Sequence, residues 1–482
     1  MFTEYVIIGD FSKAKHIFYS SVFKESISKV YYDKFIRICS IYDKPDLIKD
    51  FYLTLSLHYL EKEEFTKVID SASRCIDTYR KFAKKDFYTY DPSVNSICKM
   101  ISNRIACNVN NRTDNRVGIV YQICHTHHSN YPAIIHALDL TLFKFHNRSI
   151  FQVYAVVTDK PNATNNNFEK LKSRLHKRGI TIVDSSKEDP YEYVTDIVQK
   201  TAELNIKILI ATCLDNSSSL IFTYAVRNTK KISIIFGTPS VHTNEDFDLA
   251  ITPHKMALKY LPCEGKYINT STSSLIENPV SKSIHSRISN KILSRFVILI
   301  YGRTEKVISK PILNLFTRLL NNNKKINIRI LGANPTDVKA RLTHLSKTQL
   351  NRVEIFDRSI DYFSRLKACD LAIDTFPNGG AQSIFDIVSL SIPIITFSNK
   401  PNFFISFNEY SFSNSLTLPK ELIFSSPSSR KIVPFINKLS KDRELCYELG
   451  KKCFKLLSKQ TRNATDIVKQ YEKEYLRLLD MN

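Results

Sequence analysis

Short apolar runs alternate with amphipathic stretches along most of the chain, starting near residue 116. The runs are rich in Val, Ile and Phe, which favour strands, and the stretches between them carry apolar residues at helical spacing, as in Asn166–Lys177 and residues 193–204. The predicted strands form two series, at Val117–Ile123, Phe151–Val157, 180–183, Ile206–Ala211 and 232–236, then at Phe296–Tyr301, 326–332, Val353–Phe356, Leu371–Ile373 and Ile394–Phe397. Strands that alternate with helices predict doubly wound parallel sheets.

The residues before this pattern are predicted to be helical. Residues 50–79 place apolar side chains near helical spacing around a polar break at 61–64, which predicts a helix–turn–helix unit of about the size of a tetratricopeptide repeat. No second copy lies in register, so we expect an all-α N-terminal domain rather than a repeat array. Residues 429–480, at the other end, are predicted to form a helical tail.

The pattern divides the chain into three predicted domains. An all-α N-terminal domain spans 1–112, and Rossmann-like domains span 113–280 and 281–482, the second with the helical tail. Residues 269–294, rich in Ser and Asn, are interpreted as the linker between the two Rossmann-like domains. Two such α/β domains facing a cleft form the GT-B arrangement, in which ligands bind at the carboxyl ends of the strands.

Composition supports a soluble globular protein of several domains. The 482 residues are 43% hydrophobic and 24% charged, and no apolar run reaches the roughly 18 residues that a membrane span needs. Glu4 precedes a very short apolar patch, which is a poor signal peptide. The ten cysteines form no CxxC pair, and several lie inside apolar runs, which favours reduced thiols and argues against a zinc site. We therefore expect a cytoplasmic protein.

The formal charge of +22 has two interpretations. It favours acidic partners, such as a nucleotide, a nucleic acid, an anionic membrane surface or an acidic protein. It is equally typical of a biased genome, because the chain is rich in Lys, Asn, Ile and Ser and its basic residues are spread out. Aromatic and basic residues are not interleaved in a recognised nucleic-acid-binding motif, so we do not expect nucleic acid as a partner.

Residues 370–399 carry the clearest candidate for a ligand site. Leu371–Ile373 is a predicted strand, the Pro-Asn-Gly-Gly sequence at 377–380 is a predicted turn, and apolar residues at helical spacing follow until Pro393. The N–H groups of a turn and the positive end of a helix dipole form an anion site, here suited to a diphosphate. The alternative is an ordinary strand–helix turn without a ligand.

Four segments of residues 296–399 resemble the C-terminal half of glycosyltransferase family 41, which holds the O-GlcNAc transferases and the bacterial cytoplasmic N-glycosyltransferases of adhesins. They are Tyr301-Gly302-Arg303-Thr304-Glu305-Lys306, Asn351-Arg352-Val353-Glu354-Ile355-Phe356, the helix and strand that hold Tyr362, Arg365 and Asp370 to Asp374, and Asn378-Gly379-Gly380-Ala381-Gln382. Residues 236–240, Phe247-Asp248 and the loop at 125–132 are similar to segments of the family's first half. This chain departs from the family at Ala381 and Gln382, where Thr is common, and it lacks the long N-terminal repeat array.

The resemblance implies roles for particular residues. It implies that Lys306 contacts the diphosphate of the nucleotide, that Tyr362 and Arg365 contact the base and ribose, and that the turn of Asn378, Gly379, Gly380, Ala381 and Gln382 binds the diphosphate. For Lys306 the alternative is a solvated surface lysine, and for Tyr362 a core aromatic. Asp248 and Asp374 follow or flank strands. Each carboxylate either has a functional role or only holds its loop in place.

His125, His127 and His128 crowd one loop after the first strand. Imidazoles there can supply a general base near neutral pH, and we take His125 and His128 as the candidates. An exposed polar loop is the alternative. No acidic partner lies at ligand spacing from these histidines, so we predict no metal site.

The predicted function is an inverting, metal-independent hexosyltransferase of GT-B fold. It moves a hexose from a UDP-sugar, the donor substrate, to an Asn or Ser/Thr side chain of a protein, and needs no further cofactor. The nucleotide-sugar site lies in the domain at 281–482, and the domain at 113–280 forms the acceptor side. Two alternatives stay open: a glycosyltransferase of surface polysaccharide or lipid-linked glycan synthesis at a membrane surface, and a non-catalytic scaffold that partners a true glycosyltransferase.

Overall fold

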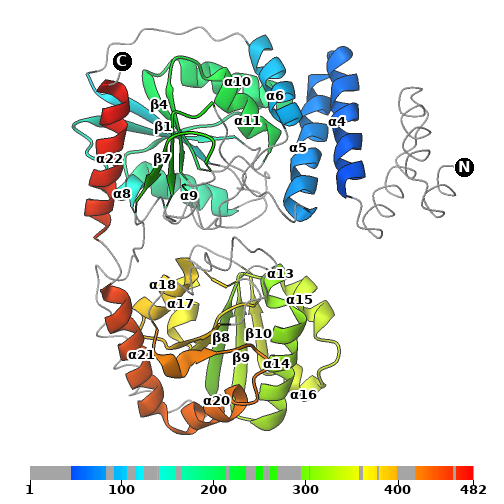
Figure 1. Cartoon of the computed structure of the whole chain (residues 1–482), viewed down its shortest axis with the longest axis vertical. Coiled ribbons are helices and arrows are strands. Elements are labelled where there is room, and N and C mark those ends of the chain that lie inside the picture. Colours follow the sequence, from blue (N-terminus) through cyan, green and yellow to red (C-terminus); the bar gives the residue numbers. More distant parts are fainter. Residues whose placement is uncertain are drawn as a thin grey trace, which may run out of the picture.

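The computed structural model describes seventeen stretches of the chain: 45–82, 92–105, 115–123, 138, 141–158, 166–212, 216–234, 246–252, 258, 261–268, 295–302, 304–357, 362–376, 379–380, 382–398, 418–459 and 463–480. They form two α/β units, one above the other in Figure 1, with three helices beside the first.

The first α/β unit is built on a seven-stranded parallel sheet in the order β3-β2-β1-β4-β5-β6-β7. Its strands are β1 (Val117–Ile123), β2 (Phe151–Val157), β3 (Thr181–Val183), β4 (Ile206–Ala211), β5 (Lys230–Ile234), β6 (Leu249–Thr252) and β7 (Gly265–Tyr267). The strand order reverses between β1 and β4, so the loops after these two strands leave on opposite faces. That position is the usual ligand crevice of a doubly wound sheet.

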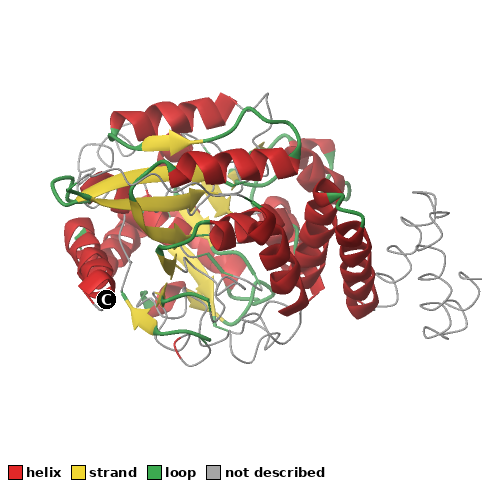
Figure 2. Cartoon of the chain, turned by 90° about the horizontal axis from the view of Figure 1, so that it is seen from above, coloured by secondary structure: helices red, strands yellow, loops and turns green. Residues whose placement is uncertain are grey.

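Helices cover both faces of this sheet, as Figure 2 shows from above. The core on one face includes residues of α10 (Pro190–Ala202) and α11 (Ser217–Ala225), and the core on the other includes residues of α8 (Leu142–Phe145) and α9 (Asn166–Lys177). Successive residues of β1 alternate between the faces, with Val120 in the first core and Tyr121 in the second. Both are fully buried, as a parallel sheet between two helical layers requires.

The N-terminal helices share an apolar cluster with the first α/β unit. They are α4 (Pro45–Glu61), α5 (Phe65–Phe82) and α6 (Pro92–Arg104). Ile69 and Cys98 lie in one apolar cluster with Leu220 of α11. The Ser217 hydroxyl donates to the Ile69 carbonyl at 2.7 Å, and the Ser73 and Ser217 hydroxyls are 2.7 Å apart. The distinct domain over 1–112 stays a prediction, and these three helices pack on the first unit through this cluster.

The second α/β unit repeats the same topology with six parallel strands, in the order β10-β9-β8-β11-β12-β13. The strands are β8 (Phe296–Tyr301), β9 (Ile326–Leu331), β10 (Val353–Phe356), β11 (Leu371–Ile373), β12 (Ile394–Phe397) and β13 (Ile423–Phe424). Its helices are α13 (Thr304–Val307), α14 (Lys310–Asn322), α15 (Pro335–Arg341), α16 (Lys347–Leu350), α17 (Tyr362–Lys367), α18 (Gln382–Ser389), η2 (Lys420–Leu422), α20 (Ile432–Lys441) and α21 (Arg443–Ser458). Here the order reverses between β8 and β11. The α/β class predicted from the alternating pattern is confirmed.

The last helix, α22 (Ala464–Asp480), returns to the first unit, although we assigned the whole tail to the second (Figure 1). Tyr471 and Tyr475 are buried in the core on the Tyr121 face of the first sheet. By contrast, α21 packs on the second unit, where Gly450 lies so close to Ser391 that a Cβ would be 2.0 Å from its carbonyl oxygen. The tail is thus divided between the two units.

A buried polar chain fixes α22 to the first sheet. Glu472 accepts from His146 Nδ1 at 2.9 Å, so that nitrogen carries the proton and Nε2 accepts from the Tyr121 hydroxyl at 2.6 Å. Tyr475 adds a hydroxyl 3.3 Å from that of Tyr121. Burial lowers the pKa of His146, and the Glu472 carboxylate offsets part of this effect. Among the described residues, no helix has the length and apolar character to cross a membrane.

Candidate functional site

Lys306 lies against the glycine turn of the second unit, 73 residues away in the chain. It is carried by the short helix α13 just after β8, and its Nζ donates to the Gly379 carbonyl at 3.0 Å. Because β8 and β11 are neighbours in the sheet, their carboxyl ends bring Lys306 and this turn to the point where the strand order reverses. A Cβ at Gly302 would lie 2.9 Å from Thr375 Cγ2, so glycine permits the close approach of the two strand ends.

Asp374, the first residue after β11, organises the start of the turn. The carboxylate is buried, and its Oδ1 accepts from the backbone N–H groups of Thr375 at 2.9 Å and Gly380 at 2.6 Å. The other oxygen, Oδ2, accepts from the Thr396 hydroxyl at 3.2 Å. Asp374 thus makes the contacts of a loop-supporting residue, one of the two roles that we left open for it. Asp248 similarly accepts from the Lys231 backbone N–H at 2.7 Å.

These contacts correct one part of the predicted anion site. We expected the amides of both glycines to face a ligand, but the Gly380 N–H donates to Asp374 within the protein. The Gly379 carbonyl, an acceptor, receives the lysine. Lys306 thus supplies this strand edge with a cation that suits an anion.

Arg365 packs on an aromatic ring. Its guanidinium lies 4.1 Å from the ring centre of Phe356, the last residue of β10, and the ring is also approached by Arg329 at 5.7 Å. The Arg365 backbone carbonyl accepts from Arg329 Nη1 at 2.9 Å. Arg329 is also paired with the Glu354 carboxylate at 2.6 Å. The predicted contact of Arg365 with a nucleotide stays a prediction.

Several predicted site residues fall outside the described part of the chain. These are His125, His128, Asn378 and Ala381. Tyr362 and Gln382 are the first residues of α17 and α18, and their side chains are likewise outside the description. Their roles stay predictions.

Metal and thiol chemistry find little support in the described residues. No group of three or more His, Cys, Asp and Glu side chains there could hold a metal ion. Burial raises the pKa of the Cys263 thiol to about 11 and raises those of Cys98 and Cys446 further. These thiols stay protonated near neutral pH and are weak nucleophiles.

The described polar groups at the corresponding edge of the first sheet bond to one another. Gln122 of β1 donates from Nε2 to the Ser219 carbonyl and to the Thr223 hydroxyl, both at 2.9 Å. Thr212, after β4, donates to the Gln122 carbonyl at 2.6 Å, and the hydroxyls of Thr158 and Ser219 are 2.7 Å apart. All five side chains are buried. This network could not be predicted, because Gln122 lies inside an apolar run of the sequence.

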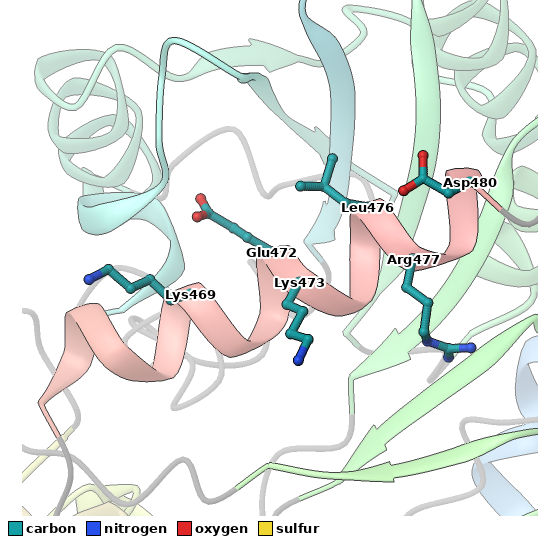
Figure 3. Close-up of a pocket in the computed structure, with 6 residues that line it drawn as sticks. All are labelled: Lys469, Glu472, Lys473, Leu476, Arg477 and Asp480. Atoms are coloured by element: carbon teal, nitrogen blue, oxygen red, sulfur yellow. The ribbon is translucent and has the colours of Figure 1, made fainter.

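A depression of about 620 Å³ lies along α22 on the first unit (Figure 3). The described residues that line it all come from this helix: Lys469, Glu472, Lys473, Leu476, Arg477 and Asp480. Their charges are mixed and project in different directions, and Arg477 is already paired with Glu264 at 2.6 Å. The depression contains none of the residues around Lys306, and we do not assign it to catalysis.

Comparison with known proteins identifies the fold. A structure of Anabaena HepE with UDP-glucose matches with a TM-score of 0.54 and 13% identity, over 76% of this chain and 100% of that one. A structure of an S. aureus TarM variant with UDP matches with a TM-score of 0.53 and 10% identity, over 75% and 100%. The fold is GT-B. The prediction of a GT-B fold is thus confirmed.

The comparisons leave the family open. No family model and no curated protein sequence matches the chain. A Thermobaculum terrenum O-GlcNAc transferase variant covers 90% of this chain and 86% of its own at 14% identity. Its TM-score of 0.46 is too low to carry an argument, so membership of family 41 stays a prediction.

Proposed function

We propose that the protein is a glycosyltransferase that takes a hexose from a UDP-sugar. The observation that carries this proposal is the position of Lys306 on the Gly379 carbonyl, at the strand-order reversal of the second sheet in a GT-B fold. Ligands of doubly wound sheets bind at such a reversal, and the anion-compatible group described there is a lysine. HepE and TarM, which share the fold, have been crystallised with UDP or UDP-glucose.

In this proposal Lys306 stabilises the leaving diphosphate. Negative charge grows on the β-phosphate as the bond to the sugar breaks, and a preorganised ammonium offsets it. The lysine keeps one of its three N–H groups on the Gly379 carbonyl and turns another to a phosphate oxygen. The displacement is in line at the anomeric carbon, inverts its configuration and uses no metal, with His125 or His128 as the base.

The proposed acceptor is an Asn or Ser/Thr side chain of a protein. The first α/β unit, with α4–α6 packed against it, forms the acceptor side, because the nucleotide occupies the second unit. A cytoplasmic location agrees with the free thiols of the described cysteines. A glycan or lipid acceptor is distinguished by product: labelled sugar from the UDP donor must enter trichloroacetic-acid-precipitable protein and not an organic extract.

The donor is tested by thermal shift with UDP, GDP and ADP at equal concentrations. A ligand that binds only the folded state raises the melting temperature by mass action. We expect UDP to raise it most, in buffer with EDTA as well as without. A shift with GDP that equals that with UDP contradicts the proposed donor, and no shift with any nucleotide favours a non-catalytic scaffold.

A further inference from the structure

One peptide group joins the two charged side chains of the candidate site. The bond between Gly379 and Gly380 supplies both the carbonyl that accepts from Lys306 and the N–H that donates to Asp374. A trans peptide is planar, with its C=O and N–H pointing in opposite directions. The ammonium and the carboxylate therefore hold opposite ends of one rigid unit.

Asp374 is suited to fix that unit in place. It leaves the central strand β11, is 3% exposed, and is itself bound on three sides, to Thr375, Gly380 and Thr396. The bond from Gly380 is 2.6 Å long, and a hydrogen bond to a charged acceptor is stronger than a neutral one. Such a bond also polarises the peptide, which makes the Gly379 carbonyl a better acceptor for the lysine.

The glycine at 380 belongs to the same arrangement. A Cβ there would lie 2.6 Å from Ser383 Oγ, 3.2 Å from Ile384 Cγ1 and 3.4 Å from Asp374 Oδ1. The peptide is thus held close to the first turn of α18. Side chains at this position would compete with the contact between Asp374 and the backbone.

We propose that Asp374 is a positioning residue: by orienting the Gly379–Gly380 peptide, its carboxylate sets the place of the Lys306 ammonium and so the affinity for a nucleoside diphosphate. Asp374 does not touch the ligand. The inference rests on the proposed function, because it takes UDP as the ligand of Lys306. It adds Asp374 to the proposed site as a residue that acts on Lys306 through the backbone peptide.

A double-mutant cycle on UDP affinity tests this role. We expect Asp374→Ala to weaken UDP binding about tenfold or more, and Lys306→Ala by at least as much, measured by isothermal titration. Because Asp374 acts through the lysine, the double variant should bind UDP no more weakly than Lys306→Ala alone. A residue that only stabilised the fold would lower the melting temperature without this non-additivity.

Thr396→Val is the matched control. It removes a hydrogen bond from the other carboxylate oxygen and leaves the Gly379–Gly380 peptide untouched, so UDP affinity should stay within about twofold of wild type. If Asp374→Ala does not fold, Asp374→Asn carries the test, with a loss of about three- to tenfold because a neutral acceptor holds the peptide less firmly.

The outcomes separate this inference from the proposed function. Additive losses in the double variant, or an Asp374 variant with wild-type affinity, overturn the positioning role and leave the UDP site standing. A Lys306→Ala variant that binds UDP normally also overturns it. A wild-type protein that binds no UDP overturns both the proposed function and the inference.

Discussion

The two sheets of this protein share one topology, yet their carboxyl edges are used differently. At the reversal between β1 and β4, Gln122, Thr212 and Ser219 satisfy one another and are buried. At the reversal between β8 and β11, Lys306 is held only partly buried on a backbone carbonyl. The described polar groups of the first edge join strands to α11, whereas the second edge presents a cation.

The difference shows that topology alone does not make a ligand site. Both edges have the strand reversal that favours one, but a site also needs polar groups that can still bond to a ligand. It is costly to displace buried hydroxyls and an amide that have several partners each. The Lys306 ammonium has three N–H groups, so it can hold the Gly379 carbonyl and also bind a phosphate oxygen, which is a charged and stronger acceptor.

The largest expected effect comes from removing residues 1–112. Ile69, Cys98 and their neighbours form one core with α10 and α11, and each fully buried large apolar side chain contributes about 1.5–3 kcal/mol. Several such losses exceed the 5–15 kcal/mol or so by which a domain is stable. We expect the first unit to lose its cooperative melting transition, seen by calorimetry. A truncated chain that melts as the full chain does would show that α4–α6 are a separate domain after all.

The same truncation also tests how the two sheet edges differ in UDP binding. The second unit has its own core and does not depend on α4–α6. If the truncated chain remains soluble, UDP should still shift the transition of the second unit. Loss of that shift in a folded second unit would place part of the nucleotide site elsewhere.

The next largest effect is a loss of stability from the Gln122 network at the carboxyl edge of the first sheet. Gln122→Leu keeps roughly the size of the side chain but removes the amide that bonds to the buried Ser219 carbonyl and Thr223 hydroxyl, so we expect a loss of about 1–3 kcal/mol in unfolding free energy. UDP affinity should not change. Urea denaturation and UDP titration on the same variant measure both quantities, and a variant with normal stability and weakened UDP binding would make the first edge a ligand site.

The smallest effect is a pH dependence from the chain that holds α22. Because burial lowers the pKa of His146 below 6.5, the unfolded chain binds more protons than the folded one just below that pH. Stability should therefore fall as the pH drops below about 6.5 and be insensitive to this group above it. In His146→Gln the fall should be shallower. Equal slopes in urea midpoints between pH 5 and 7 would contradict the buried neutral imidazole.

Much of the architecture could be predicted because long apolar runs make central strands. β1, β2, β4, β8 and β11 lie where the pattern placed them. The strands β6, β7 and β13 were missed; of these, the edge strands β7 and β13 have only three and two residues, too few for a recognisable apolar run. The place of α22 was also missed, because an amphipathic pattern shows that a helix packs but not on which sheet.

The candidate site could be predicted only in outline. Lys306 and the glycine turn were expected near one another from the resemblance and the strand order, and the structure brings them together. The direction of the Gly379–Gly380 peptide could not be predicted, because composition shows that glycine permits many conformations and not which one is adopted. That direction gives the N–H to Asp374 and the carbonyl to Lys306.

The most direct test of the central claim is the specificity constant of Lys306→Ala, measured with the UDP-sugar that the thermal shifts select. Removing one preorganised charge should cost about 2–4 kcal/mol of transition-state stabilisation. Lys306→Arg should restore little, since a planar guanidinium does not replace a compact ammonium. Lys310→Ala, at an exposed lysine four residues on, is the matched control and should leave turnover unchanged.

Melting temperatures complete this measurement. Lys306 is only partly buried and outside the apolar core, so the Ala variant should melt within a few degrees of wild type. Our interpretation predicts a stable variant whose kcat/KM falls roughly 30- to 1,000-fold. A stable Lys306→Ala variant with near wild-type kcat/KM would contradict it.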